Sequence, residues 1–133
     1  MITVSTDKNK LDIHFIQNFL KDTYWAKNRT IETLQISIDN SLCYGISLDD
    51  EQIGFSRVIS DLVSIAYLMD VFIIDKHRGK GYSTILVNAM MNEPKLQEIK
   101  IWGSATLDAH FLYKKFGFTS VENPEKLMEK IIK

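Results

Sequence analysis

The chain has 133 residues, of which 45% are hydrophobic and 25% charged, and 16 Lys and Arg nearly balance 17 Asp and Glu, giving a net charge of -1. This composition excludes a mainly disordered chain, and the length favours one domain over residues 1–133. Without a basic excess, we expect no nucleic-acid partner. The single cysteine excludes an intramolecular disulfide. Because we find no signal sequence and no long apolar run, we expect a cytoplasmic protein with no membrane partner.

Hydrophobic spacing in the first half of the chain predicts two helices followed by an antiparallel hairpin. In chain order, these elements are a helix at 11–20, a helix at 30–40, and strands at 42–48 and 52–59. One of the polar residues Ser5–Asp7 is expected to cap the first helix, because each has an oxygen that can accept from free helix N–H groups. Residues 24–29 form a predicted loop that carries aromatic side chains.

The second half begins with the most apolar stretch of the chain. Residues 64–74 are a near-continuous hydrophobic run, which is typical of a central strand covered on both faces. The remaining elements are a loop at 75–81, a helix at 82–92, a strand at 99–102 and a helix at 108–115. The tail from Thr119 to Lys133 fits either a final strand or a short helix. This order predicts a mixed α/β domain with helices on both sides of a central sheet.

The loop Lys76–Ser83 joins the apolar strand to the next helix and has the most specific chemistry. The free N–H groups at the start of a helix bind anions, phosphate above all. Gly79 and Gly81 let the backbone approach such a ligand, while Arg78 and Lys80 add positive charge. The loop therefore predicts a site for a pyrophosphate or a similar anion.

Two common phosphate loops fit this segment poorly. A Walker A loop would need glycine in place of Ile74, and Ser or Thr in place of Gly81. The dinucleotide fingerprint would need a third glycine at Thr84, and here the loop follows a hairpin instead of opening the first strand–helix unit. A nucleotide-binding domain is therefore kept as an alternative, in which ATP or NADH would occupy the loop.

A third interpretation rests on two motifs. Lys76-x-x-Gly79-x-Gly81 resembles the Gln/Arg-x-x-Gly-x-Gly/Ala loop of the GNAT acetyltransferase superfamily, with Lys in the first position. Further along, Ala109-x-x-x-Tyr113-x-x-x-Gly-Phe resembles the superfamily's Asn-x-x-Ala-x-x-x-Tyr-x-x-x-Gly-Phe, with a threonine at the Asn position. Both motifs occur in the expected order, and the resemblance covers nearly the whole chain. It extends to a group of small bacterial GNAT proteins whose acceptors are mostly unassigned.

This resemblance implies the GNAT fold and transfer of an acetyl group from acetyl-CoA to an amine of a small molecule, or of a protein. In the superfamily the amine attacks the thioester carbonyl directly, without a covalent enzyme intermediate. The pantetheine arm pairs with the edge of the strand before the loop, and the pyrophosphate lies on the loop. The coenzyme-binding residues implied in this way are Val71, Phe72, Ile73, His77, Arg78, Gly79, Lys80, Gly81, Tyr82, Ser83, Thr106 and Ala109.

The resemblance also implies catalytic roles. Tyr113 takes the place of the superfamily's tyrosine, which protonates the leaving thiolate as a general acid. A backbone N–H within Phe72–Ile73 is expected to polarise the thioester carbonyl. The superfamily has no fixed residue that deprotonates the acceptor ammonium. Asp70, His110 and Asp61 are therefore our candidates for the general base, beside water.

Several alternatives stay open. Tyr24, Trp25 and Arg29 lie in the segment that borders the acceptor pocket in the superfamily, or else they pin that loop to the core. The departures at Lys76 and Thr106 keep a coenzyme-binding or sensing domain without efficient transfer as an alternative function. A pure interaction module would bind no small ligand. The superfamily makes a homodimer an expectation, and the three histidines and one cysteine lack metal-ligand spacing, so we expect no metal.

Overall fold

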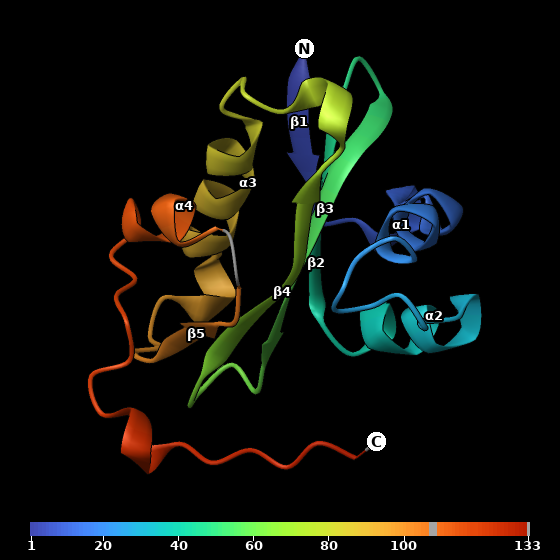
Figure 1. Ribbon diagram of the computed structural model, residues 1–133. Coiled ribbons are helices and arrows are strands. Elements are labelled where there is room, and N and C mark those ends of the chain that lie inside the picture. Colours follow the sequence, from blue (N-terminus) through green and yellow to red (C-terminus); the bar gives the residue numbers. More distant parts are fainter. Residues whose placement is uncertain (107–108, 133) are drawn as a thin grey trace.

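A computed structural model describes residues 1–106 and 109–132 and shows one sheet between two helical layers (Figure 1). Within these residues the strand order is β1-β2-β3-β4-β5, with antiparallel neighbours from β1 to β4 and a parallel pair at β4–β5. The strands are β1 (Ile2–Ser5), β2 (Leu42–Leu48), β3 (Glu51–Ser60), β4 (Ala66–Ile73) and β5 (Trp102–Ser104). The predicted fold class, a mixed and mostly antiparallel sheet flanked by helices, is confirmed.

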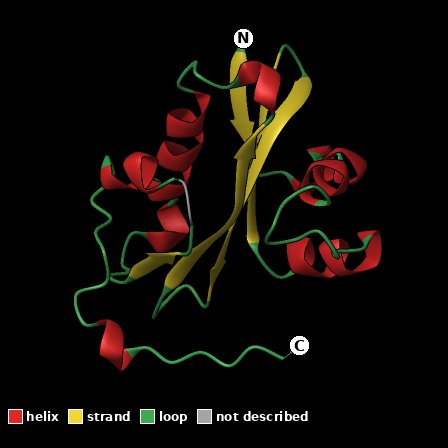
Figure 2. Ribbon diagram, viewed as in Figure 1, coloured by secondary structure: helices red, strands yellow, loops and turns green. Residues whose placement is uncertain are grey.

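Helices cover both faces of the sheet (Figure 2). One layer holds α1 and α2, and the other holds α3 and α4 (Figure 1). The α-helices of the described residues are α1 (Ile13–Leu20), α2 (Ile31–Asp39), α3 (Tyr82–Met91) and α4 (His110–Lys114). Short 3-10 turns span Lys8–Lys10, Asp75–His77, Pro94–Leu96 and Pro124–Lys126.

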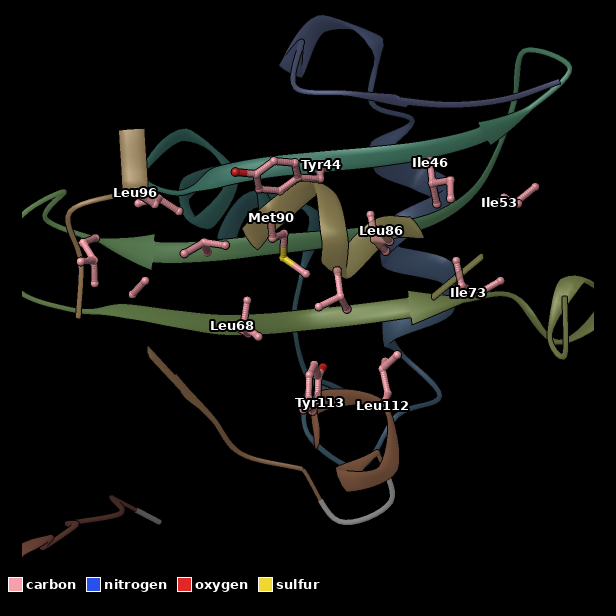
Figure 3. Close-up of a cluster of buried hydrophobic side chains, with 14 residues drawn as sticks. Tyr44, Ile46, Ile53, Leu68, Ile73, Leu86, Met90, Leu96, Leu112 and Tyr113 are labelled. Carbon is pink, nitrogen blue, oxygen red and sulfur yellow. The ribbon is translucent and has the colours of Figure 1, made fainter. Parts of the chain in front are cut away.

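Each helical layer packs on the sheet through its own hydrophobic core. The core beneath α1 and α2 contains Ile16, Leu20, Leu34 and Ile38. The larger core beneath α3 and α4 draws on all strands from β2 to β4 (Figure 3). Its labelled members are Tyr44, Ile46, Ile53, Leu68, Ile73, Leu86, Met90, Leu96, Leu112 and Tyr113. Both faces of β3 and β4 are therefore buried, as the near-continuous apolar run of β4 predicts.

The first two helices begin where side chains satisfy their free N–H groups. Asp12 accepts a hydrogen bond from the Phe15 N–H at 3.0 Å and so caps α1. Thr30 and Thr33 form a reciprocal capping box at the start of α2, as the predicted helix start at Thr30 requires. The second cap lies at the end of the loop that joins α1 to α2 and fixes where that loop enters α2.

The N-terminal prediction was wrong in one respect. The segment Ser5–Asp7 does not cap α1, because Ser5 ends β1 and Asp7 caps the 3-10 turn Lys8–Lys10. β1 itself was not expected, since its polar and apolar residues are too few to give a clear periodic signal. It forms because β2 offers an edge, with pairs from Ile2–Leu48 to Ser5–Gly45.

The C-terminal half also differs from the prediction in two places. The strand predicted at 99–102 begins only at Trp102, because pairing with β4 sets its register. In the described part of the tail, the structure forms the 3-10 turn Pro124–Lys126 and no strand. The helix predicted at 108–115 is α4, although Asp108 lies outside the described residues.

Candidate active site

β4 loses one of its two neighbours halfway along its length. It pairs with β5 from Ala66–Trp102 to Leu68–Ser104, and no further pair with β5 forms among the described residues. The remainder of the strand, including Val71–Ile73, keeps β3 on one side only. Its other edge therefore presents backbone N–H and C=O groups that a peptide-like ligand can use.

A β-bulge accompanies this opening. Phe55 of β3 pairs with Phe72, whereas Arg57 pairs with Met69, so β4 has an extra residue in between. Asp70 lies at the bulge with a φ of 53°, in the left-handed region that aspartate tolerates better than most side chains. The bulge bends β4 next to the residues that the resemblance assigns to the coenzyme.

The glycine loop presents an open helix start. Gly79 and Gly81 have φ of 77° and 82°, and a Cβ added at either would meet no atom within 4 Å. Backbone conformation, and not crowding, therefore requires glycine at both positions. Gly81 is the N-cap of α3, so no side chain caps the N–H groups of Tyr82 and Ser83. Lys80 is exposed beside them, and the arrangement suits a bound anion.

Two other side chains of the loop, those of Arg78 and His77, differ in their surroundings. Arg78 donates from Nε to the Ile73 carbonyl at 2.9 Å and pairs with Asp75 at 2.6 Å. Its guanidinium also lies 6.0 Å from the centre of the Phe19 ring. His77 is half-buried, and its Nδ1 has no hydrogen-bond partner among the described residues. Arg78 thus contacts the end of β4 while much of its side chain stays exposed to solvent.

A cavity of about 730 Å³ opens beside the free edge of β4. Its wall is formed by α1, the loop after α1, the end of β4 with the loop that follows it, the start of α3, and α4. The predicted residues in the wall are Val71, Phe72, Ile73, Arg78, Ser83, Ala109 and Tyr113. Aromatic side chains add Phe15, Phe19, Tyr24, Trp25 and Phe111. The predicted residues outside the wall are Asp70, His77, Gly79, Lys80, Gly81, Tyr82, Thr106 and His110. The two sequence motifs therefore meet at one cavity, although not every motif residue reaches it.

α4 supplies the tyrosine of the second motif. Tyr113 is buried in the larger core and also forms part of the cavity wall, and Figure 3 shows it on α4 opposite β4. The ring lies 5.6 Å from that of Phe118, centre to centre. Thr106, which replaces the asparagine of the motif, accepts a hydrogen bond from the Ala109 N–H at 3.2 Å. A threonine can thus hold the start of α4 in this chain.

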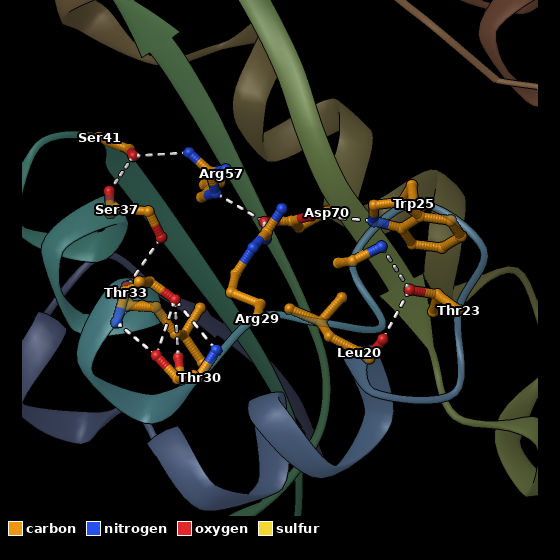
Figure 4. A network of polar contacts seen from close by, with 12 residues as sticks. Leu20, Thr23, Trp25, Arg29, Thr30, Thr33, Ser37, Ser41, Arg57 and Asp70 are labelled. Carbon is orange, nitrogen blue, oxygen red and sulfur yellow. Dashed lines mark hydrogen bonds and ion pairs between the residues drawn. The ribbon is translucent and has the colours of Figure 1, made fainter. Parts of the chain in front are cut away.

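Asp70 is the centre of a buried polar network (Figure 4). One carboxylate oxygen accepts from Trp25 Nε1 at 2.9 Å. The other accepts from Arg29 at 2.5 Å and from Arg57 Nε at 2.7 Å. Arg57 also donates to the Ser41 hydroxyl at 3.1 Å. The network therefore ties the loop after α1 to the bulge of β4.

None of the three candidate bases is well placed to take a proton in the cavity. Both oxygens of Asp70 are occupied by donors, two of them cationic, which favours a positioning role. His110 is exposed, with Nε2 3.0 Å from the Thr106 carbonyl. Asp61 lies in the turn between β3 and β4, where hydrogen bonds from Ser64 lower the pKa of its carboxyl. The structure does not bring these side chains together.

Sequence reasoning missed two features of the site. Phe19 stacks on Phe72 with ring centres 3.9 Å apart, and Phe15 lies 5.9 Å from the same ring. The two α1 residues share a helix face at a spacing of four, but nothing in that spacing reveals the strand they contact. Arg57 gave a clearer signal that was overlooked, because a charge within an apolar strand needs a buried partner.

The Asp70 network also shows how the loop between α1 and α2 is held, which the sequence left open between lining a pocket and pinning the loop to the core. Tyr24 and Trp25 line the cavity, while Arg29 turns toward Asp70 and away from solvent. Trp25 lines the cavity and also donates a hydrogen bond from Nε1 to Asp70. The loop is therefore pinned to the core and borders the cavity at the same time.

Comparison with known proteins places this cavity in context. The acetyltransferase (GNAT) family matches residues 13–118, which include both motifs and every element of the cavity wall. The chain belongs to this family. A protein of Gibberella zeae named "Putative acetyltransferase" is 27% identical, over 84% of this chain and 75% of its own length. The GNAT resemblance inferred from the two motifs is thereby confirmed.

Solved structures agree with this assignment. A "putative acetyltransferase belonging to the gnat family" from Xanthomonas campestris pv. campestris is 46% identical to this chain. The two structures superpose with a TM-score of 0.95, over 99% of this chain and 94% of the Xanthomonas chain. A "predicted acetyltransferase" from Clostridium acetobutylicum, solved with acetyl-CoA, shares the fold at 15% identity, with a TM-score of 0.73 over 98% and 96% of the two chains. The chain is therefore an acetyltransferase at the level of its GNAT family.

Two structural features are absent from the described residues of this GNAT protein. No helix they form is long and apolar enough to cross a membrane. They contain no group of three or more His, Cys, Asp or Glu side chains that could hold a metal ion.

Proposed function

We propose that the protein transfers an acetyl group from acetyl-CoA to the amine of a small molecule by direct attack on the thioester. The observation that carries this proposal is that a free strand edge and an uncapped helix start lie next to each other in the chain. The edge of Val71–Ile73 lacks a strand neighbour among the described residues, and the uncapped start of α3 follows it within one loop. A ligand with a peptide-like arm and a pyrophosphate matches both features.

The coenzyme is held mainly by backbone groups. The pantetheine amides pair with the free edge of β4, as an added strand would. The pyrophosphate accepts from the N–H groups at the start of α3, beyond Gly81, where no Cβ intervenes. Arg78 stays with Asp75 and the Ile73 carbonyl, so its role is to close the cavity near the phosphates.

Two groups act on the thioester. A backbone N–H of Phe72–Ile73 stabilises the negative charge that develops on the carbonyl oxygen, which is worth about 3–4 kcal/mol in well-studied enzymes. Tyr113 protonates the leaving thiolate from the opposite wall of the cavity. The new N–C bond forms as the C–S bond breaks, and the phenol proton passes to sulfur.

The acceptor amine approaches from the aromatic side of the cavity. Asp22 lies in this wall, and its carboxylate makes no ion pair with any described residue. The other acidic residue of the wall, Asp75, is neutralised by Arg78. We assign to Asp22 the attraction of the acceptor ammonium, whose proton then leaves through water, because Asp70 and His110 are engaged elsewhere.

Calorimetric titration with acetyl-CoA tests the coenzyme site, with ATP and NADH as controls. We expect micromolar binding of acetyl-CoA and no competition from either nucleotide. Competition by ATP or NADH would favour a nucleotide-binding domain, and the absence of any binding would contradict the coenzyme site. Binding without turnover on a broad panel of primary amines would instead favour a sensing domain.

The Tyr113→Phe variant tests the general acid. Removing such help typically slows a reaction about 10²–10⁴-fold. We expect kcat to fall by that amount while the Kd for acetyl-CoA stays unchanged. Tyr44→Phe is the matched control, because Tyr44 is a buried tyrosine whose hydroxyl bonds Glu93 at 2.9 Å and does not line the cavity. Equal rates in the two variants would remove Tyr113 from the mechanism.

A further inference from the structure

Among the described residues of the cavity wall, some aromatic side chains remain largely exposed. Tyr24 is 56% exposed, Trp25 41% and Phe111 69%. Phe19 of the same wall differs from them, because its ring already stacks on that of Phe72. An aromatic ring contributes most when a large part of its surface is buried. Exposed rings that line a cavity therefore indicate a place where a ligand completes the packing.

Tyr24 and Trp25 form a corner within this wall. The centres of their rings lie 5.0 Å apart, and the ring planes meet at 77°. A third ring that lies flat on one of the two is then nearly perpendicular to the other. Offset stacking and edge-to-face contact are the two arrangements that aromatic pairs prefer. The corner can therefore give a planar ligand both favourable contacts at the same time.

The ring of Trp25 is held in place before any ligand binds. Its Nε1 donates to Asp70 at 2.9 Å (Figure 4). The carboxylate of Asp70 is itself fully buried and is fixed by Arg29 and Arg57. A side chain that is already ordered loses little conformational entropy when a ligand packs on it. The corner is thus preorganised on the side of Trp25.

The charges of the wall restrict the ligand further. The charged side chains of the wall are those of Asp22, Asp75 and Arg78. Arg78 pairs with Asp75 at 2.6 Å, which leaves the carboxylate of Asp22 to attract a cation. A ligand carboxylate would meet no uncommitted cation among the described residues of the wall, and an unpaired charge is costly to remove from water. The wall therefore favours a ligand with one positive charge and no negative charge.

We propose that the acceptor is a primary amine joined by a short chain to an aromatic ring. The ring packs in the corner of Tyr24 and Trp25, and the ammonium lies at Asp22, which precedes both residues in the same loop. This inference rests on the transfer function proposed above, because it names the acceptor of that reaction. The amine nitrogen loses a proton and gains the acetyl group, and coenzyme A leaves as the thiol. Phe111, from α4, adds apolar surface to the same cavity.

A comparison of matched amines tests the proposal on the wild-type protein. Phenethylamine and cyclohexylethylamine have the same carbon skeleton and the same ammonium, but the second ring is saturated. Because the saturated ring is also apolar, a preference for the aromatic amine reports ring contacts. We expect kcat/KM to be higher for phenethylamine by about fivefold or more. Equal values for the two amines would overturn the proposal.

Phenylalanine tests the charge of the wall, because it adds a carboxylate to the skeleton of phenethylamine. We expect kcat/KM for phenylalanine to be lower by about tenfold or more, since its carboxylate lacks a free cation in the wall. A preference for phenylalanine over phenethylamine would contradict the assignment of a singly charged acceptor.

The Trp25→Leu variant tests the corner itself. We expect the preference for phenethylamine over cyclohexylethylamine to fall to about one, with the Kd for acetyl-CoA unchanged. Trp25→Phe restores a ring without Nε1 and should recover part of the preference. Trp102→Leu is the matched control, because Trp102 lies outside the wall and its Nε1 donates to the Ile99 carbonyl at 3.3 Å. A folded Trp25→Leu that keeps the full preference would contradict the proposal.

Phe111→Leu provides a second test if Trp25→Leu does not fold. Phe111 is largely exposed on α4, and the substitution leaves the hydrogen bonds of Asp70 in place. We expect a partial loss of the aromatic preference. An unchanged preference in this variant would remove Phe111 from the acceptor site, and the comparison of matched amines on the wild type would still decide the proposal.

Binding measurements separate this proposal from the transfer function on which it rests. Calorimetric titration with the two amines is carried out on the protein alone and on the protein saturated with coenzyme A. Tighter binding of phenethylamine without turnover would support the aromatic site and contradict the transfer function. Turnover of both amines at equal rates would support the transfer function and overturn the aromatic site. Failure of both amines to bind at millimolar concentration would also overturn it, whatever the affinity for acetyl-CoA.

Discussion

Two polar regions flank the cavity, and they differ in whether their hydrogen-bonding groups already have partners within the chain. At Asp70, two arginines and a tryptophan occupy both carboxylate oxygens. At the start of α3, no side chain caps the helix and the space in front of Gly81 is open. The first region is complete within the chain, whereas the second presents donors that a ligand can satisfy.

The difference shows how the same polar chemistry serves structure or binding. A buried charge is tolerated only when its partners are fixed, so the Asp70 network holds the bulge of β4 and the α1–α2 loop in one arrangement. Free helix N–H groups that are exposed to solvent cost little stability, because water satisfies them. An anion can then replace that water when it binds. Stability and coenzyme affinity are therefore expected to respond to different substitutions.

Asp70→Ala is expected to have the largest effect, and on stability. The substitution leaves Arg57 and Arg29 as buried or half-buried cations without their anion, and breaking such a pair typically costs about 3–5 kcal/mol. The free energy of unfolding, measured with urea, should fall by that amount.

Asp49→Ala is the control for Asp70. Asp49 also has a positive φ, 50° against 53°, and it pairs with the N-terminal amine, but at an exposed position. Exposed pairs contribute at most about 1 kcal/mol. Equal losses for the two variants would show that backbone conformation, and not the buried network, makes Asp70 important.

Gly81→Asp is expected to weaken acetyl-CoA binding at least tenfold, or about 1.4 kcal/mol. The new carboxylate lies where the pyrophosphate is expected and repels it. Gly81→Asn is the matched control, since Asn has nearly the same size and the same tolerance of positive φ without the charge. Titration of both variants separates charge from strain, and equal affinities would contradict a phosphate at this position.

Cys43 allows a test of whether water is excluded from the side of the sheet on which Asp70 lies. Burial raises the pKa of its thiol from 9.0 to about 11. As pH rises, the unfolded chain therefore loses this proton first, so the free energy of unfolding is complete below pH 9 and falls between pH 9 and about 11. By pH 10 the loss is on the order of 1 kcal/mol.

Urea unfolding of wild type and Cys43→Ala from pH 7 to 10 measures this contribution. The difference between the two curves isolates Cys43 from Tyr44, whose pKa burial also raises. We expect the wild type to lose more stability than the variant above pH 9. Parallel curves would show that the thiol is hydrated in the folded protein.

Asp22→Asn is expected to have the smallest effect, a rise of about 2–5-fold in KM for the amine with little change in kcat. The carboxylate is exposed to the cavity and screened by salt, so its attraction for an ammonium is modest. Steady-state kinetics at low and high salt measure it. A KM that responds to salt but not to the substitution would place the attraction elsewhere.

Local signals in the sequence were enough for the glycine loop and most elements. Gly79 and Gly81 indicated the anion-binding turn because positive φ has a residue signature, and the long apolar run indicated β4 because burial of both faces removes alternation. Tyr113 was singled out by the resemblance of its motif to that of the GNAT superfamily. Each of these depends on residues close together in the chain.

The tertiary structure decided what depends on distant partners. Asp70 was a plausible base until Trp25, Arg29 and Arg57 were brought to it from 13 to 45 residues away in sequence. The parting of β5 from β4 is equally invisible to periodicity, because any residue but proline supplies the same backbone groups. Side-chain patterns report burial and turns, whereas only the assembled fold determines which polar groups are already satisfied.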